Sequence, residues 1–244
     1  MKHIILILSL SLLVICATAS ADEKGWSYSG SNGPQAWASL SPEMFACAGK
    51  NQSPINLTGF IKAQLAPINI HYAAAPGSIV NTGHDIKIDY PAAGSIWVEG
   101  IEFKLKQFHF HAPSENQING HSFPLEGHFV NVDSEGSITV LAVMFQEGKP
   151  NKALELLWQN IPADVGMTNV LPVAFNADSL LPLKRSYYRF NGSLTTPPCA
   201  EGVRWIVFKQ PLSVSKQQLA AFAKVMGQPN NRPIQPLNAR VVLE

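Results

Sequence analysis

The sequence predicts a mainly β (α+β) fold: a single domain with a large twisted, mostly antiparallel sheet and short peripheral helices. Short stretches of alternating apolar and polar residues recur along the chain between turn residues, whereas helical patterns are few. No internal repeat or low-complexity linker divides the 244 residues, which fit one large domain. With 46% hydrophobic and 14% charged residues, the chain has the composition of a protein that buries a core.

Seven stretches are candidate strands, and several of them alternate in the way that is typical of half-buried strands. They are residues 68–72, 86–90, 95–98, 103–111, 125–132, 138–145 and 204–208. The sequence Asp-Ser-Glu-Gly at 133–136 lies between two of the strongest and predicts a hairpin turn there.

Two helices are predicted near the surface. Ala153, Leu154, Leu157 and Trp158 share one face of a short predicted helix. Ser215 and Gln218 have the spacing of a capping box, in which each side chain bonds to the backbone of the other residue, so a second helix is expected to begin there.

The net charge excludes two classes of partner. The chain has 18 basic and 17 acidic residues and a formal charge of +1. It therefore lacks the positive excess with which proteins bind nucleic acids or anionic lipid surfaces. It also lacks an apolar stretch long enough to predict a membrane-spanning helix.

Residues 1–21 are predicted to be a signal peptide. A short basic start is followed by an apolar stretch at 4–15 and by small residues suited to cleavage at 17–21. The alternative is a buried N-terminal element. We expect residues 22–244 to form the single domain of the mature protein, in the periplasm or outside the cell.

Cysteine counting agrees with an extracytoplasmic location. Cys16 lies in the segment that we expect to be removed, which leaves Cys47 and Cys199. An even pair in an oxidising compartment favours a disulfide, and two buried free thiols are the alternative.

The stretch 107–111, Gln-Phe-His-Phe-His, places two histidines on one face of a strand. Side chains alternate along a strand, so Gln107, His109 and His111 share a face while the two phenylalanines occupy the other. Two imidazoles in this arrangement can bind one metal ion. The motif alone is weak evidence, because a pair of hydrogen-bonded core histidines has the same pattern.

A third histidine strengthens the metal hypothesis. His128 follows Glu126 on the next predicted strand, and residues 112–124 are a short excursion that lets the two strands be antiparallel neighbours. Three histidines with one open position are typical of catalytic zinc sites. Gln107 and Glu126 each precede a histidine by two residues, so each can accept the remaining imidazole N–H.

A stiff loop is predicted at residues 191–199. Thr195 and Thr196 are followed directly by two prolines and Cys199. Such a loop can hold a hydroxyl rigidly against a reacting group. Taken alone, it has the pattern of an ordinary proline-rich surface turn.

Together these segments resemble the α-class carbonic anhydrases, in particular their secreted or periplasmic bacterial branch. The resemblance covers nearly all of residues 22–244 and implies a sheet of about ten strands. The matching segments are 26–28, 32–34, 51–56, 81–84, 107–111, 113–115, 126–130, 192–198, 205–207 and 230–233.

The resemblance implies a role for individual residues. His109, His111 and His128 match the Zn²⁺ ligands, Thr195 with Glu115 matches the pair that orients the nucleophile, and His84 matches the proton shuttle. The remaining matches are Gln107, Glu126 and Asn230 around the ligands, Val130, Val143, Leu194, Thr196 and Trp205 in the substrate pocket, and Tyr28 and Asn81 in the solvent network.

The implied activity is the reversible hydration of carbon dioxide to bicarbonate and a proton. An esterase side activity and inhibition by sulfonamides and small anions are also implied, and a homodimer is left open. The alternatives are a binding module on the same fold and a metallohydrolase acting on esters. The chain keeps all three histidines, whereas binding modules of this family typically lack one, which favours the enzyme.

Overall fold

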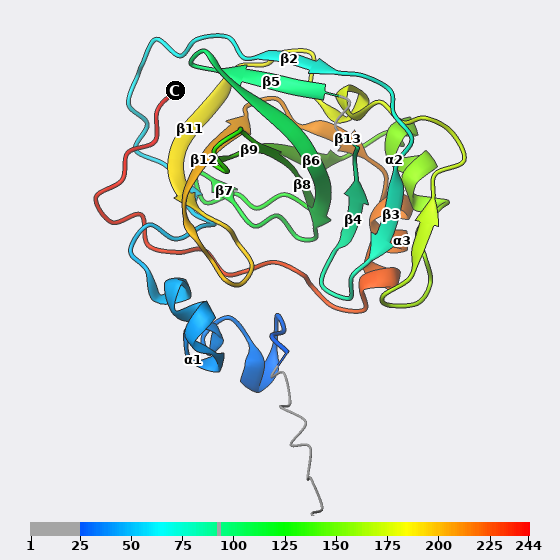
Figure 1. Ribbon diagram of the computed structural model, residues 1–244, viewed down its shortest axis with the longest axis horizontal. Helices are drawn as coiled ribbons and strands as arrows, with labels where there is room; N and C mark the ends of the chain where they lie inside the picture. The colour runs from blue at the N-terminus through cyan, green and yellow to red at the C-terminus, as the bar shows by residue number, and fades with distance from the viewer. Residues whose placement is uncertain (1–24, 92–93) are drawn as a thin grey trace, which may run out of the picture.

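The computed structural model describes residues 25–91 and 94–244 and consists mostly of one large curved sheet (Figure 1). The predicted signal peptide lies outside these residues. The sheet has eleven strands in the path β10-β3-β4-β6-β8-β9-β12-β11, with β2, β5 and β13 attached beside it. The strands of this sheet are β2 (Asn69–Tyr72), β3 (Ser78–Asn81), β4 (Ile86–Asp89), β5 (Gly94–Val98), β6 (Ile101–His111), β8 (Leu125–Val132), β9 (Ile138–Glu147), β10 (Thr168–Val170), β11 (Tyr187–Ser193), β12 (Glu201–Phe208) and β13 (Leu212–Val214).

The remaining elements are short. Strands β1 (Asn56–Leu57) and β7 (Gln117–Ile118) form a separate two-stranded sheet. The helices are α1 (Trp37–Leu40), α2 (Lys152–Trp158) and α3 (Lys216–Met226), and the 3₁₀ helices are η1 (Gly30–Asn32), η2 (Pro42–Ala48) and η3 (Ala177–Leu180). In the large sheet, β12 and β13 pair with β9 in parallel and the other pairs are antiparallel, which confirms the predicted fold class.

The two faces of the sheet carry different hydrophobic clusters. One face packs on α2 and α3, through residues such as Phe108, Leu157 and Phe222, and forms the larger hydrophobic cluster. The opposite face carries a smaller cluster around Trp205 and Val140. Because side chains alternate along each strand, β6 and β8 can contribute phenylalanines to the first face and histidines to the second.

Every predicted strand and both predicted helices are present. The turn at 133–136 joins β8 to β9, and Ser215 caps α3 through the expected capping box with Gln218. Strands β1, β3, β7, β10, β11 and β13 were not predicted, and all of 191–199 was expected in a loop although 191–193 belong to β11. In β11, Arg189, Asn191 and Gly192 interrupt the apolar pattern by which the other strands are identified.

Candidate metal centre and active site

Three histidines from two neighbouring strands come together on the second face of the sheet. His109 and His111 lie on β6, and His128 on β8 is the direct register partner of His109. One ring nitrogen of each residue lies within 4.8 Å of the others. The exposed fractions are 9%, 0% and 1%, so the group is almost closed to solvent, with His109 as its most accessible member. The pattern predicted from the sequence therefore produces a potential metal site.

Each of these imidazoles has one nitrogen occupied by an acceptor. His109 Nδ1 lies 2.8 Å from Gln107 Oε1, and His111 Nδ1 donates to the Asn230 carbonyl at 2.7 Å. His128 Nε2 lies 2.9 Å from Glu126 Oε1. These bonds fix the tautomers and leave Nε2 of His109 and His111, and Nδ1 of His128, free to bind a metal.

Burial disfavours the charged form of two of these imidazoles. Removal from water, together with the neighbouring His111, lowers the pKa of His128 to about 3, although Glu115 acts in the opposite direction. Burial also lowers the pKa of His109 well below its usual value, partly opposed by Asp85. Imidazoles that are neutral at pH 7 have a lone pair available, which is the form that binds metal ions.

Glu126 connects this site to the chain that follows β6. Its Oε2 accepts the backbone N–H groups of Glu115 and Asn116, each at 2.8 Å, and its Oε1 accepts the Asn116 amide at 2.7 Å. Burial raises the pKa of this carboxyl, and the hydrogen bonds from Asn116 and Glu115 act in the opposite direction. The residue that orients His128 therefore also positions Glu115.

The Glu115 carboxylate faces the free nitrogens. It is 1% exposed, and its Oε1 accepts the backbone N–H of Arg232 at 2.8 Å. Its Oε2 has no hydrogen-bond partner and lies 3.5 Å from His111 Nε2 and 3.9 Å from His128 Nδ1. His111 Nε2 also has no partner. Leaving two buried polar atoms without partners at one point costs folding free energy, unless a further group binds between them.

The loop with the two threonines is held close to this site. β11 ends at Ser193, and the loop closes on itself through the Leu194 N–H, which donates to Ala200 O at 3.0 Å. The predicted disulfide between Cys47 and Cys199 is confirmed, with an S–S distance of 2.04 Å. Thr195 is 5% exposed and Thr196 is half-buried. Within the described residues, no hydrogen bond joins the Thr195 hydroxyl to Glu115, whose Oε2 is unpartnered.

An apolar wall lies beside His128. Val130, Leu194 and Trp205 pack in one cluster, and the Trp205 ring lies edge-on to His128 with centroids 4.9 Å apart. The structure corrects the placement of Val143. His128 is the register partner of Ala142, so Val143 points to the opposite face and packs in the other cluster.

Val140 takes the place that the sequence analysis gave to Val143. It is 2% exposed, and it pairs with Val130 on β8 and with Trp205 on β12. Val203, two residues before Trp205 on the same face, also belongs to this wall. Val140 was missed because the side chains of an almost wholly apolar strand can be assigned to a face only once its register is known. Val203 was missed because it lies just before the predicted stretch 204–208.

His84 lies in the turn before β4 and at the edge of the site. Its ring stacks on Trp26 with centroids 3.8 Å apart, and its Nε2 lies 2.9 Å from the Trp26 carbonyl oxygen. Strand β4 begins only at Ile86, two residues later. The contact between His84 and Trp26 was not predicted, because the two residues are far apart in sequence.

The two residues expected in a solvent network differ in their surroundings. Asn81 is 2% exposed, and its amide bonds to the Pro162 carbonyl at 3.3 Å and to the Gly83 N–H at 3.1 Å, so it holds the turn before His84. The Tyr28 hydroxyl is buried without a partner. Burial raises the pKa of Tyr28 well above its usual value, and the charge of Glu115 adds to this effect.

The comparison with protein families decides the assignment. The family model described as eukaryotic-type carbonic anhydrase matches residues 32–244. The chain belongs to the carbonic anhydrase family. A carbonic anhydrase of Pectobacterium carotovorum is 45% identical over 97% of this chain and 98% of its own. A carbonic anhydrase of Neisseria gonorrhoeae is also 45% identical, over 96% of this chain and 94% of its own.

A solved structure agrees with these relatives. The α-carbonic anhydrase of Thermovibrio ammonificans, in complex with the inhibitor sulfanilamide, is 52% identical with a TM-score of 0.89. The match covers 90% of this chain and 99% of that one. This carbonic anhydrase is therefore an enzyme, and the activity of its family is the hydration of carbon dioxide. Among residues 25–91 and 94–244, no helix is long and apolar enough to cross a membrane.

Proposed function

We propose that the protein is a zinc-dependent carbonic anhydrase that interconverts carbon dioxide with bicarbonate and a proton. The observation that carries this proposal is the group of three buried histidines, each with one ring nitrogen within 4.8 Å of the others. The unpartnered His111 Nε2 supports it, because a cation coordinated by the imidazoles would satisfy this buried atom.

The donor set fits zinc. Zn²⁺ prefers nitrogen ligands in tetrahedral geometry, and three imidazoles leave one open position. When bound, Zn²⁺ lowers the pKa of a coordinated water to about 7, the value known for carbonic anhydrases as a class. Gln107, Glu126 and the Asn230 carbonyl keep the three ligand nitrogens deprotonated and correctly oriented.

Thr195 and Glu115 orient the reacting oxygen in this proposal. The Thr195 hydroxyl accepts a hydrogen bond from that oxygen and donates its own proton to Glu115. Glu115 is suited to this task because its Oε2 is buried and free. The Cys47–Cys199 disulfide holds the end of the loop that carries Thr195.

The apolar wall receives the substrate. Carbon dioxide has no net dipole, so it gains from contact with Val130, Val140, Leu194 and Trp205, and these side chains also exclude water from the reacting carbon. Thr196 lies beside Thr195 at the partly exposed end of the pocket.

His84 carries the proton to solvent. Imidazole is the side chain that gains and loses protons most readily near neutral pH. In the structure, His84 Nε2 is engaged with the Trp26 carbonyl, so proton transfer involves a change of ring position or of partner. Its partial exposure on the turn at 82–85 gives it access to solvent.

Several finer properties belong to the same proposal. Inhibition by sulfonamides is supported by the sulfanilamide complex of the Thermovibrio relative. Small anions are expected to inhibit at the open metal position, and an esterase side activity would use the same activated water. The disulfide supports a periplasmic or secreted location, where thiols are oxidised.

The test is a carbon dioxide hydration assay on protein of known zinc content. We expect activity that is lost on treatment with pyridine-2,6-dicarboxylate and regained on adding zinc. A zinc-loaded protein that hydrolyses p-nitrophenyl acetate but does not hydrate carbon dioxide would instead be an esterase. A protein that binds zinc and sulfanilamide but catalyses neither reaction would be a binding module.

A further inference from the structure

The hydrogen bond that fixes the Glu115 carboxylate comes from the far end of the chain. Oε1 of Glu115 accepts the main-chain N–H of Arg232 at 2.8 Å. Since the other oxygen has no partner, the position of the Arg232 backbone sets the position of the whole carboxylate. Arg232 lies in a segment outside the named helices and strands, so no regular element holds that backbone in place.

The side chain of Arg232 adds to the hydrogen bonds by which Asn230 and Gln235 hold this segment. The residue is 2% exposed, and its guanidinium lies over the Trp37 ring, 5.3 Å from the centroid. Nη1 donates to Gln52 Oε1 and to the Ser53 carbonyl, both at 2.8 Å, and Nη2 donates to the Cys47 carbonyl at 3.1 Å. The guanidinium is thus fixed to residues 47–53, which lie far from it in sequence.

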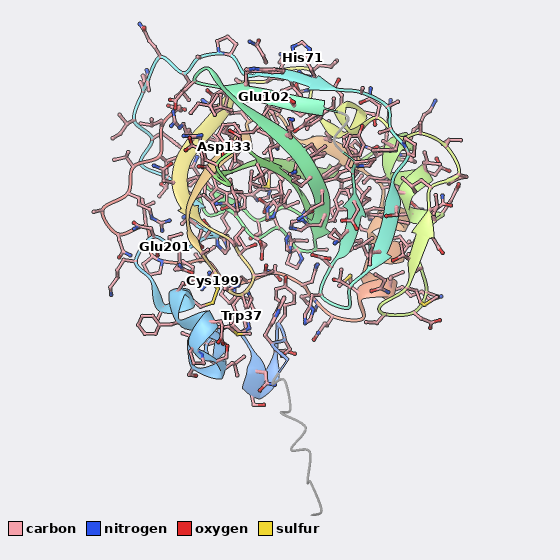
Figure 2. All side chains as sticks on the ribbon, viewed as in Figure 1. Trp37, His71, Glu102, Asp133, Cys199 and Glu201 are labelled. Carbon is pink, nitrogen blue, oxygen red and sulfur yellow. A yellow bond between two sulfur atoms is a disulfide. The ribbon has the colours of Figure 1, made fainter. Side chains whose placement is uncertain are left out.

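The same segment holds the loop that contains Thr195. Cys47 is bonded covalently to Cys199, and Gln52 Nε2 donates to the Cys199 carbonyl at 3.1 Å. Figure 2 shows Trp37, Cys199 and Glu201 close together at the end of the molecule where the N-terminal helices lie. Residues 47–53 therefore contact both segments that position the Thr195–Glu115 pair.

We propose that Arg232 is a positioning residue for catalysis, whose guanidinium aligns Glu115 with Thr195 by tying both to residues 47–53. The proposal rests on the role assigned to Glu115 above. A need to fill space does not explain why an arginine is buried here. An apolar residue of similar volume would fill the same space without the free-energy cost of burying a charge. All three acceptors of the guanidinium are neutral oxygens, so an ion pair with them does not account for it either.

The first experiment measures how Arg232 and Glu115 interact in catalysis. Arg232→Met removes the anchor, and we expect kcat for carbon dioxide hydration to fall about 10-fold with KM and zinc content unchanged. In a protein that already carries Glu115→Gln, adding Arg232→Met should change kcat less than about 2-fold. Arg232 is proposed to act through the Glu115 carboxylate, which this protein lacks. Arg232→Lys should restore part of kcat, since its ammonium can reach one of the acceptors.

A control substitution separates positioning from stability. Arg185 pairs with Asp178, its side chain is 31% exposed, and it lies outside the site. We expect Arg185→Met to leave kcat unchanged. If Arg232→Met and Arg232→Lys lower the melting temperature but leave kcat at the wild-type value, Arg232 is only structural and the proposal is wrong.

The second experiment does not depend on activity. The Arg232 amide proton, bonded to a carboxylate, should resonate downfield in the ¹⁵N-resolved NMR spectrum of the zinc-free protein. Glu115→Gln and Arg232→Lys should each move this resonance, whereas Arg185→Met should not. An unmoved resonance in Arg232→Lys would show that the guanidinium does not hold the backbone and would overturn the proposal.

Failure of the proposed function would look different. If Glu115→Gln has wild-type kcat at full zinc content, the role of Glu115 is wrong, whatever Arg232 does. If Glu115→Gln lowers kcat and the Arg232 variants do not, the role of Glu115 stands and that of Arg232 falls.

Discussion

The imidazole of His84 lies flat on the indole of Trp26, and its Nε2 is 2.9 Å from the carbonyl oxygen of the same residue. One tryptophan therefore both supports the ring and occupies one of its nitrogens. A histidine that only filled a core would be fully buried, but His84 is partly exposed on a turn. This combination fits a group that exchanges protons with solvent from a defined resting position.

Replacing His84 by Ala should slow proton export and spare the hydration step. We expect maximal turnover to fall in weak buffer while kcat/KM stays nearly unchanged. Added imidazole should restore part of the loss, because a diffusing base can replace a tethered one. Stopped-flow assays at several buffer concentrations measure this. An equal loss of kcat and kcat/KM would assign His84 to the structure of the site instead.

Zinc binding should depend on each of the three clustered histidines. His128→Ala removes one ligand and should lower both zinc content and activity, since two imidazoles bind the ion far more weakly. His121→Ala is the control, because His121 is exposed in a loop. Elemental analysis after dialysis gives the zinc content. Full occupancy and activity in His128→Ala would refute the assignment.

Thr195→Ala should reduce turnover by about 10²-fold, as the loss of an orienting group commonly does. Zinc content should not change, because Thr195 is not among the clustered ligands. Thr195→Ser keeps the hydroxyl and should retain most of the activity. The comparison is made at matched zinc content, and equal rates for the Ala variant and the wild type would contradict the proposed role.

The corrected pocket leads to a test on two neighbouring valines. Val140→Tyr should fill the space beside Val130 and Trp205 and block hydration while zinc stays bound. Val143→Ala should destabilise the fold by roughly 1–3 kcal/mol through a small cavity in the core, with turnover of the folded protein unchanged. If Val140→Tyr left hydration unchanged and Val143→Ala lowered turnover, Val143 and not Val140 would line the pocket.

Acid should destabilise the zinc-free protein. Burial lowers the pKa of His128 to about 3 and lowers that of His109 as well, so between about pH 6.5 and 3 the unfolded chain binds protons that the folded chain does not. The free energy of unfolding should therefore fall as the pH is lowered through this range. The raised pKa of Glu126 has the opposite effect on the free energy of unfolding. We expect the two histidines to outweigh this single carboxyl.

Urea unfolding of chelator-treated protein at several pH values measures this effect. The variant His128→Gln should show a weaker dependence on pH than the wild type, because one of the responsible groups is gone. If the free energy of unfolding changed equally steeply with pH in both proteins, other groups would cause the acid sensitivity.

The metal site was predictable because its pattern is local. His109 and His111 share a face by strand alternation, and the short excursion to His128 brings the next strand alongside. The contacts of Arg232 and Trp26 were not predictable from pattern, because they join segments far apart in sequence through irregular backbone. Val140 shows a third case, in which a uniformly apolar strand hides which side chains face the site.

The covalent bond between positions 47 and 199 closes a ring of chain that contains all three histidines and Thr195. Asn230 and Arg232 lie outside this ring, although one orients His111 and the other holds Glu115. A chain that emerges from its N-terminus can therefore seal the ring before the residues that complete the site are available. Cleavage after position 229 would leave the ring and its three histidines in one covalent unit, but it would remove the carbonyl that orients His111 and the N–H that binds Glu115.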